Sequence, residues 1–449
     1  MTLEEYKQYI SGKKVAVVGI GVSNLPLIDF LVDCGAKVSA CDKQTRDKIE
    51  DTAALLEKKG VNLKLGEDYL TKLDVDVIFK TPGMRPDIDE FENARKNGFQ
   101  ITSEMELFFE ICPCEIIAVT GSDGKTTTTT LIGEMLKKEG FNCHIGGNIG
   151  KPLVSEVENM LPTDKVVLEL SSFQLFTLKK SPKVAVVTNV SPNHLDWHKN
   201  FEEYVEAKKN IMKYQNKDAI LVTNLDNDTT VKMAEQAKGE SRTFSCKKDA
   251  LVRLSDGAIY YGDEKIINVD DIRIPGCHNV ENYMAAIAAV RDYVSNETID
   301  YVAKNFGGVE HRIEFVREIN GIKFYNDSIA SSPTRTMAAL RSFDKKLILI
   351  AGGYDKKIPF DELGVKINEK VKELVLVGHT SEKIKKAVLK AGKETNITVC
   401  EDFEQAVISA YSKAKPGDIV ILSPACASFD LFKNFMVRGE TFKKIVNNI

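Results

Sequence analysis

The segment 120–126 combines two glycines, a lysine and a threonine at a spacing suited to phosphate binding. An apolar run at 115–119 leads directly into Gly121 and Gly124, which allow a tight turn with inward-pointing N–H groups. Lys125 adds a point charge, and the Thr126 hydroxyl can ligate Mg²⁺ at the start of a helix. Only Ser122 and Asp123 separate the glycines, so the turn is a shortened P-loop. We expect it to bind a nucleoside triphosphate.

Two further polar residues follow apolar runs, and the carboxyl ends of parallel strands meet at one edge of a sheet. Glu169 follows such a run, and its carboxylate with the Thr126 hydroxyl would form a set of hard oxygen ligands for Mg²⁺. A paired structural charge would explain Glu169 equally well. His194 could ligate a second metal, touch substrate or have a structural role, whereas the nearby His198 is expected at the surface.

The elements that must position these residues belong to an α/β fold. Short apolar runs alternate with longer amphipathic segments along the 449 residues, and 43% apolar content is enough for a large core. We predict a Rossmann-like domain at 1–110, a central P-loop-type ATPase domain with a mostly parallel sheet at 111–310, and a second Rossmann-like domain at 311–449.

Composition favours small-molecule partners. The net charge of −4 is spread over interspersed acidic and basic residues, so neither nucleic acid nor a membrane surface is an expected partner. Nine cysteines without a paired pattern favour a reducing compartment. Without a signal peptide or a long apolar segment, the chain is expected in the cytoplasm, and we expect a monomer.

The first domain carries a second glycine turn, at Gly19 and Gly21. Asn24 stands where a dinucleotide fingerprint has its third glycine, so NAD binding is only weakly indicated. The turn suits a diphosphate, and Asp42 ends the next predicted strand, where a ribose or base contact would lie. A tight turn without a ligand is the alternative.

Several strings now resemble the Mur ligases of bacterial cell-wall synthesis. They are Thr120-Gly121-Ser122-Asp123-Gly124-Lys125-Thr126-Thr127, Gly147-Asn148-Ile149-Gly150, Glu169-Leu170-Ser171-Ser172-Phe173-Gln174-Leu175, Pro275-Gly276-Cys277-His278-Asn279, Glu310-His311-Arg312, Asn326-Asp327-Ser328 and Ser423-Pro424-Ala425-Cys426-Ala427-Ser428-Phe429-Asp430. The closest branch adds D-glutamate to UDP-N-acetylmuramoyl-L-alanine through an acyl phosphate. A folate polyglutamate-type ligase is the runner-up, but it lacks the first domain. A protein that senses ATP without chemistry is a more distant alternative.

The resemblance implies a set of residues for each ligand. ATP would contact Gly121, Ser122, Asp123, Gly124, Lys125, Thr126, Thr127, Asn279, Asn282, Arg312 and Asp327. The UDP precursor would contact Gly21, Val22, Ser23, Asp42, Lys43, Thr81, Pro82, Gly83, Asn148, Ser171 and His194. D-Glutamate would contact Ser331, Lys356, Ser428 and Phe435.

The resemblance also implies ATP and two Mg²⁺ ions as cofactors. The catalytic residues would be Lys125, Glu169, His194 and Lys208, and the metal ligands Thr126, Glu169, His194 and Lys208. Lys208 would serve as a carbamate formed with CO₂. From the residues alone, a lysine beside Lys209 in a charged helix is more often solvated.

The chain departs from the commoner family pattern at three places. Ile329 stands where a lysine is frequent. Arg335 or Lys357 could replace the missing cation, or D-glutamate could rest mainly on Lys356. Asn193 precedes His194 where an acidic residue is common. The pair Lys356 and Lys357 leaves the D-glutamate contact ambiguous by one position.

Overall fold

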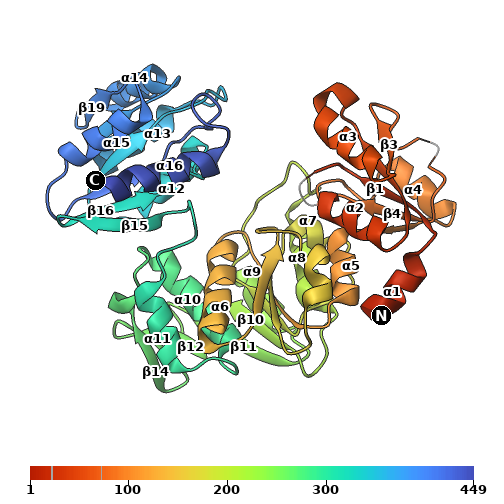
Figure 1. Ribbon diagram of the computed structural model, residues 1–449. Helices are drawn as coiled ribbons and strands as arrows, with labels where there is room; N and C mark the ends of the chain where they lie inside the picture. Colours follow the sequence, from red (N-terminus) through yellow and green to blue (C-terminus); the bar gives the residue numbers. More distant parts are fainter. Residues whose placement is uncertain (22–23, 72) are drawn as a thin grey trace. The chain divides into compact units, whose positions relative to one another are not determined.

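The computed structural model describes residues 1–21, 24–71 and 73–449, which form three β-sheets flanked by helices (Figure 1). These residues group into two compact units, Met1–Val269 with Glu281–Val302, and Asp270–Val280 with Ala303–Ile449. The first unit holds two of the sheets and the second unit holds the third. The predicted α/β class is confirmed. Among the described residues, no helix combines the length and the apolar composition needed to cross a lipid bilayer.

The first sheet has the strand order β3-β2-β1-β4-β5, with parallel neighbours. Its order reverses between β1 and β4, the point at which open α/β sheets bind ligands. The strands are β1 (Lys14–Val18), β2 (Lys37–Asp42), β3 (Asn62–Leu65), β4 (Val77–Lys80) and β5 (Gln100–Thr102). The helices are α1 (Leu3–Ile10), α2 (Asn24–Asp33), η1 (Arg46–Lys48), α3 (Glu50–Lys58), α4 (Asp89–Lys96) and α5 (Glu104–Ile111).

The second sheet has the order β14-β13-β12-β11-β10-β9-β6-β8-β7 and is parallel from β7 to β12. Its strands are β6 (Glu115–Thr120), β7 (Cys143–Gly147), β8 (Lys165–Glu169), β9 (Val184–Val187), β10 (Ile220–Asn224), β11 (Glu240–Ser245), β12 (Val252–Ser255), β13 (Ala258–Tyr261) and β14 (Glu264–Asn268). The last three strands pair antiparallel. The helices are α6 (Lys125–Glu139), η2 (Leu153–Asn159), α7 (Ser172–Leu175), α8 (Phe201–Lys213), α9 (Asp228–Ala234), η3 (Val269–Asp271), α10 (Cys277–Val290) and α11 (Asn296–Asn305).

The third sheet has the order β15-β16-β20-β17-β18-β19, and only its β15–β16 pair is antiparallel among the described residues. Asn320 and Gly321 have φ of 51° and 75° and form the two-residue turn of that hairpin. The strands are β15 (Glu314–Ile319), β16 (Ile322–Asn326), β17 (Leu347–Ala351), β18 (Val371–Leu376), β19 (Asn396–Val399) and β20 (Ile419–Leu422). The helices are α12 (Pro333–Arg341), α13 (Asp361–Lys370), α14 (Ser381–Ala391), α15 (Phe403–Ser412) and α16 (Phe435–Asn448).

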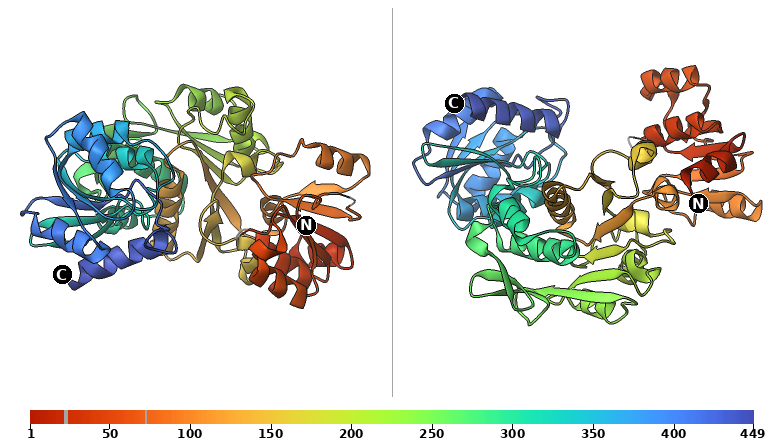
Figure 2. Two further views of the ribbon diagram at one scale, coloured as in Figure 1. Left: turned by 90° about the horizontal axis from the view of Figure 1, so that it is seen from above. Right: turned by 60° about the horizontal axis from the view of Figure 1, so that its bottom comes forward.

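Alternating side chains bury both faces of the third sheet. Leu347 and Leu349 on β17 pack with residues of α12, α13 and α14, while Ile348 and Ile350 pack with residues of α15 and α16. The ribbons show helices on both faces of this sheet (Figures 1 and 2). In the first unit, one apolar cluster contains Val17 of the first sheet as well as residues of the second sheet. The first two sheets therefore share a continuous core.

Candidate functional site

The predicted phosphate cradle, 120–126, forms where β6 ends and α6 begins. Gly124 has a left-handed φ of 80° and caps α6, and a Cβ there would collide with the Asn282 amide. A residue with a side chain would therefore strain the turn. The Lys125 Nζ donates to the carbonyl oxygens of Gly121 and Ser122, at 3.0 Å each. The lysine thus lies over the turn, where phosphate oxygens would bind.

Residues that follow β9, the strand beside β6, stabilise the cradle through hydrogen bonds. The Thr188 hydroxyl donates to the Asp123 carbonyl oxygen at 2.6 Å. The Asn189 Oδ1 accepts from the Asp123 N–H at 3.0 Å, and the Asn189 Nδ2 donates to the Asp123 carbonyl at 3.2 Å. The sequence placed both residues after a strand but gave no sign of these contacts.

Glu169 ends β8 with its carboxylate buried beside the cradle; only 2% of the residue is exposed. The Thr126 hydroxyl donates to its Oε2 at 2.6 Å, and the Asn148 Nδ2 donates to its Oε1 at 2.8 Å. Because β6, β7 and β8 are neighbours, their carboxyl ends bring the three residues together. The carboxylate, hydroxyl and amide groups offer the hard oxygen donors that Mg²⁺ prefers, so the site fits that ion.

Lys208 lies on α8, and its ammonium group is buried at the cradle. Only 1% of the residue is exposed, so it is not the solvated lysine that its charged helix suggested. Its Nζ donates to the Gly121 carbonyl at 2.7 Å and to the Thr120 hydroxyl at 3.3 Å. Burial, together with the nearby Lys125 ammonium, lowers the pKa of Lys208 well below its ordinary value. At a given pH, the uncharged amine is therefore a larger fraction of Lys208 than of an exposed lysine.

His194 begins a turn with a left-handed φ of 54°. Its ring centroid lies 4.9 Å from that of Phe173 and 6.5 Å from that of Tyr204. Burial lowers the pKa of His194, which favours the neutral imidazole that can ligate a metal. The Tyr204 hydroxyl lies 3.0 Å from the Ser122 hydroxyl and ties α8 to the cradle, a contact that sequence analysis missed.

His198 is not at the surface as expected, because the residue is 1% exposed. Its Nε2 lies 2.9 Å from the Ser172 hydroxyl, and its ring stacks on Phe173. Contacts with Ser172 and Phe173 of α7 therefore bury the His198 side chain.

The glycine turn of the first domain is closed by two side chains. The Asn24 Nδ2 donates to the carbonyl oxygens of Val18 at 3.1 Å and Gly19 at 2.8 Å, which explains the asparagine at the third glycine position. The buried Asp42 accepts from the Ile20 N–H at 2.7 Å and from the Gln44 N–H at 2.9 Å. The Asp42 carboxylate therefore holds the turn to the end of β2.

The remaining residues predicted for the UDP precursor surround this turn and the cradle. Gly21 and Lys43 are exposed, whereas Val22 and Ser23 lie outside the described residues. The segment 81–83 follows β4, the neighbour of β1. Ser171 caps α7 and accepts from the Gln174 N–H.

In the second unit, Asp327 follows β16 and is buried. Its Oδ1 accepts from the Ile313 N–H at 3.3 Å and its Oδ2 from the Ser423 hydroxyl at 2.7 Å. Burial raises the pKa of Asp327 to about 7. The Ile313 contact attaches the backbone beside Arg312 to Asp327.

The two asparagines predicted to approach the adenine both lie on α10. The Asn279 Nδ2 donates to the Pro275 carbonyl at 2.6 Å, which closes the first turn of the helix. The Asn282 Oδ1 accepts from the Thr128 hydroxyl at 3.3 Å, a contact inside the first unit.

Three residues predicted for D-glutamate, Ser331, Lys356 and Ser428, lie on loops of the second unit, whereas Phe435 begins α16. The Lys356 Nζ lies 3.5 Å from the Ser331 carbonyl oxygen. Tyr354 pairs with Ala427, which brings the Lys356 segment beside the buried Ser428. The Phe435 carbonyl accepts from the Ser328 hydroxyl at 2.7 Å.

Two basic residues are candidate substitutes for the lysine that is missing at residue 329, and their positions differ. The Arg335 Nη1 donates to the Ile329 carbonyl oxygen at 3.2 Å. Lys357 has a left-handed φ of 60°, and its N–H donates to Asp355. Arg335 is therefore the better placed of the two candidates.

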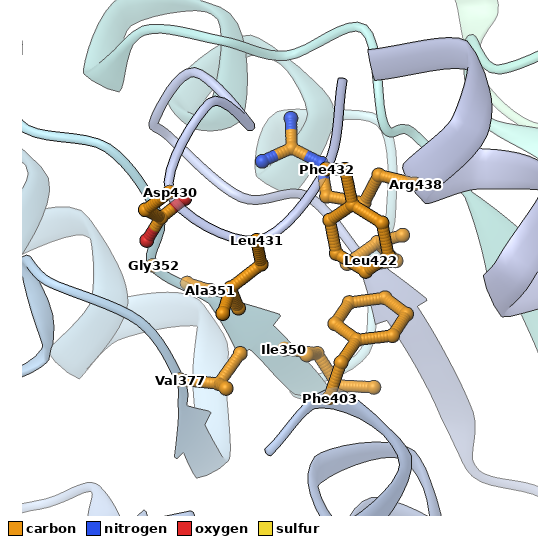
Figure 3. Close-up of a pocket in the computed structure, with 11 residues that line it drawn as sticks. Ile350, Ala351, Gly352, Val377, Phe403, Leu422, Asp430, Leu431, Phe432 and Arg438 are labelled. Atoms are coloured by element: carbon orange, nitrogen blue, oxygen red, sulfur yellow. The ribbon is translucent and has the colours of Figure 1, made fainter. Parts of the chain in front are cut away.

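A cavity of about 10 Å³ lies below these loops, at the ends of β17 and β20 (Figure 3). Gly352, Leu422, Asp430 and Arg438 are among its lining residues. This volume is about what one water molecule needs, so the cavity is too small for an amino acid.

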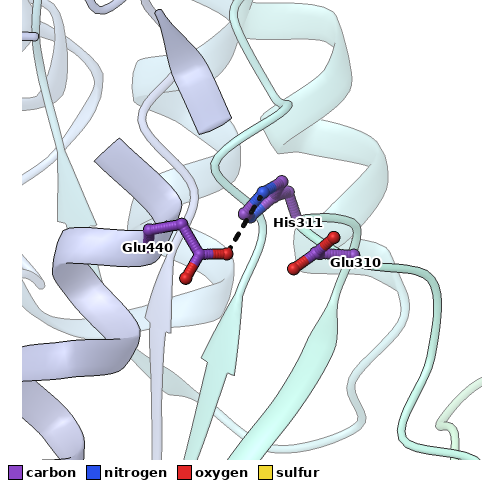
Figure 4. Close-up of side chains that lie close together, drawn as sticks. All are labelled: Glu310, His311 and Glu440. Carbon is purple, nitrogen blue, oxygen red and sulfur yellow. Dashed lines mark ion pairs between the residues drawn. The ribbon is translucent and has the colours of Figure 1, made fainter. Parts of the chain in front are cut away.

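Glu310, His311 and Glu440 also converge in the second unit, with ligand atoms within 4.8 Å of one another (Figure 4). The Lys443 ammonium already bridges the carboxylates, at 2.6 Å from Glu310 and 2.9 Å from Glu440. This cation compensates the acidic charge, and the cluster is a local ion-pair network.

Known protein families match most of the chain. The Mur ligase MurD-like N-terminal domain matches residues 13–103, the Mur ligase middle domain matches 119–290, and the Mur ligase glutamate ligase domain matches 311–426.

Full-length relatives are similar throughout. The chain is 56% identical to a UDP-N-acetylmuramoylalanine–D-glutamate ligase of Acetivibrio thermocellus, with 100% of this chain and 99% of the relative covered. It is 53% identical to the protein of the same name from Clostridium beijerinckii, with 99% of each covered.

Solved structures share the fold. UDP-N-acetylmuramate-alanine ligase MurC of Thermotoga maritima has a TM-score of 0.59 at 20% identity, with 97% of this chain and 99% of that chain covered. MurF of Acinetobacter baumannii has a TM-score of 0.57 at 15% identity, with 96% and 92% covered.

Proposed function

Because the chain belongs to the Mur ligase family, we propose that it adds D-glutamate to UDP-N-acetylmuramoyl-L-alanine with ATP, in peptidoglycan precursor synthesis. The observation that carries this proposal is the convergence of Thr126, Glu169 and Lys208 on one phosphate cradle. An ATP-binding turn alone would suit many enzymes. A buried lysine beside a buried carboxylate is better suited to a ligase, in which the negative charges of several phosphate groups must be neutralised.

The cradle binds ATP through the backbone of 121–127 and the Lys125 ammonium. The family resemblance assigns further contacts with ATP to Asn279, Asn282, Arg312 and Asp327. Thr126, Glu169 and His194 would hold two Mg²⁺ ions, which offset phosphate charge when bound. Glu169 already accepts two hydrogen bonds, which keep its carboxylate oriented toward the cradle.

Lys208 acts as a carbamate in this proposal. Its uncharged Nζ attacks CO₂, a new N–C bond forms and one proton is released, which leaves a carboxylate on the lysine. Burial and the lowered pKa of Lys208 support this step, because only the uncharged amine is nucleophilic. The carbamate would add a further oxygen ligand beside Glu169.

The UDP precursor binds along the turns that end β1, β2 and β4. The residues assigned to its nucleotide are Gly21, Asp42 and Lys43, together with the segment 81–83; the assigned Val22 and Ser23 lie outside the described residues. Asn148, Ser171 and His194 face the muramoyl end. D-Glutamate binds at Ser331, Lys356, Ser428 and Phe435, where Lys356 pairs with one of its carboxylates.

The reaction has two chemical steps. A carboxylate oxygen of the alanyl group attacks the γ-phosphorus of ATP, and the bond to the β–γ bridging oxygen breaks to give ADP and an acyl phosphate. The D-glutamate amine then attacks the acyl carbon, loses a proton and expels inorganic phosphate. Lys125 positions and neutralises the transferred group, and it also stabilises the negative charge of the tetrahedral intermediate.

Phosphate release tests this function. The purified protein is incubated with ATP, Mg²⁺, UDP-N-acetylmuramoyl-L-alanine and single L- or D-amino acids, and the product is identified by mass. Release with a new product for D-glutamate is expected. Preference for another amino acid would overturn the substrate assignment, and no release with any amino acid would overturn the ligase proposal.

A further inference from the structure

A loop of the first domain contacts the turn that carries His194. Arg85 lies between the segment 81–83 and α4, and its side chain is 20% exposed. It reaches Glu203 near the start of α8 and the backbone of Trp197. We call Arg85, Asp87, Trp197 and Glu203 the Arg85 clamp. All four residues lie in the compact unit that contains Met1–Val269.

Every N–H group of the Arg85 guanidinium has a partner. Its Nε and Nη2 bind the two Asp87 oxygens at 2.7 and 2.9 Å, and its Nη1 and Nη2 bind the two Glu203 oxygens at 3.0 Å each. Its Nη1 also donates to the Trp197 carbonyl at 2.8 Å. Two-pronged contacts of this kind fix direction as well as distance. The clamp therefore constrains the orientation of α8.

Aromatic rings support the same contact. The Arg85 Cζ lies 4.9 Å from the centroid of the Trp197 ring and 5.5 Å from that of Phe176. The Trp197 Nε1 donates to the Gly83 carbonyl at 2.8 Å, so the tryptophan bridges back to the first domain. Trp197 is therefore hydrogen-bonded to the backbone of the segment 81–83.

Each side of the clamp leads to a residue assigned to the reaction. The Trp197 N–H donates to the His194 carbonyl at 3.1 Å, so Trp197 belongs to the His194 turn. Glu203 lies on the same helix as Lys208, whose Nζ contacts the cradle. Glu203 also accepts from the Lys199 N–H at 2.8 Å. This hydrogen bond holds the segment between the His194 turn and α8 against the start of the helix.

We propose that Arg85 is a positioning residue, which holds the His194 turn and the start of α8 in place and thereby supports nucleotide binding at the cradle. It is not among the residues assigned to ATP, and it acts through Trp197 and Glu203. The inference rests on the proposed function only for the identity of the nucleotide. Its loop also carries the segment 81–83, so the precursor and nucleotide sites share one support.

The test measures binding of a non-hydrolysable ATP analogue with Mg²⁺ by calorimetry, without precursor or amino acid. R85M is compared with R95M, because Arg95 is an arginine of the same domain that pairs only locally with Glu92 on α4. We expect R85M to weaken nucleotide binding about tenfold, a size typical of mutations in coupling networks, and R95M to leave it unchanged. R85K keeps the charge but loses the two-pronged geometry, so it should fall between wild type and R85M.

Trp197 reports the clamp directly, because it is the only tryptophan in the chain. Its emission should shift in R85M and in E203Q, while the thermal unfolding midpoints stay close to wild type. The R85M/E203Q double variant should bind nucleotide little worse than R85M, because both changes break one contact.

The proposal is overturned if R85M shifts the Trp197 emission without weakening nucleotide binding, or if the emission does not change. It is also overturned if R95M weakens binding as much as R85M. E203Q provides the same test if R85M does not fold. None of these measurements uses D-glutamate, so a failure here is separate from a failure of the ligase assay.

Discussion

The phosphate cradle and the D-glutamate loops, defined here by Ser331, Lys356 and Ser428, differ in how firmly their charged groups are fixed. Glu169 and Lys208 are 2% and 1% exposed, and each makes two hydrogen bonds to neighbouring groups. Lys356 is exposed, and its Nζ lies 3.5 Å from a carbonyl oxygen, at the limit of a hydrogen bond.

The difference shows where the chain has fixed its geometry in advance. Groups that stabilise a developing charge are most effective when they need not reorganise during the reaction, and the cradle satisfies that condition. Exposed loops lose conformational freedom when they bind a ligand, which weakens binding. We therefore expect changes in the cradle to act on catalysis and changes in the loops to act on the KM for D-glutamate.

The largest expected effect is at the cradle. Lys208→Ala should lower kcat by about 10²- to 10³-fold, because it removes a buried group beside the phosphates. Formate or acetate should restore part of the activity by replacing the carbamate. Lys209→Ala is the matched control, since Lys209 pairs with Glu206 one turn earlier on the same helix and should have little effect. Full activity of Lys208→Ala would refute the carbamate.

A smaller and different effect is expected in the loops. Lys356→Met should raise the KM for D-glutamate at least about tenfold, the loss typical of one hydrogen bond to a charged group. The KM for ATP should stay constant in steady-state assays. Lys357→Met tests the neighbouring lysine, and a larger effect there would reassign the D-glutamate contact to Lys357.

Ile329→Lys should modestly strengthen D-glutamate binding at the loops. A lysine at this position would add a second cation beside D-glutamate, and we expect a KM for D-glutamate lower by up to about fivefold, as for an exposed ion pair. An unchanged KM, together with a higher KM in Arg335→Met, would show that Arg335 already supplies the cation.

Glu104, on α5, is a buried carboxylate that is not among the residues assigned to the reaction; it is 8% exposed. Burial raises its pKa from 4.5 to about 7. The folded protein therefore binds more protons than the unfolded chain between these values, and its stability falls as pH rises through that window.

Glu104→Gln removes the ionisable group, so the variant should be more stable than wild type above pH 7, by up to about 3 kcal/mol from the pKa shift. The difference should shrink toward pH 5. Urea unfolding at pH 5 and pH 8 checks this, with kcat as the control for function. A constant difference at both pH values would contradict the buried charge.

The sequence predicted the strands and the motifs more reliably than the contacts between them. The predicted apolar run at 115–119 lies within β6, because a short apolar segment before a glycine turn is typical of a parallel strand that is buried on both faces. Glu169 and Thr126 were expected to meet because strand ends share one edge, and they do.

Contacts made by side chains distant in the sequence could not be predicted in this way. The Asn24 amide replaces a glycine by bonding two carbonyls, and nothing in its neighbours indicates this. His198 is buried against Ser172 and Phe173, which belong to a separate segment of the chain. The antiparallel strands β13 and β14 also extend a sheet that the sequence indicated as mostly parallel.

The most direct test of the account follows oxygen from the precursor. UDP-N-acetylmuramoyl-L-alanine labelled with ¹⁸O in its alanyl carboxylate is incubated with ATP, Mg²⁺ and D-glutamate, and the products are analysed by mass spectrometry. The account predicts one ¹⁸O atom in the released phosphate and a product extended by D-glutamate. Unlabelled phosphate, or phosphate release without that product, would contradict it.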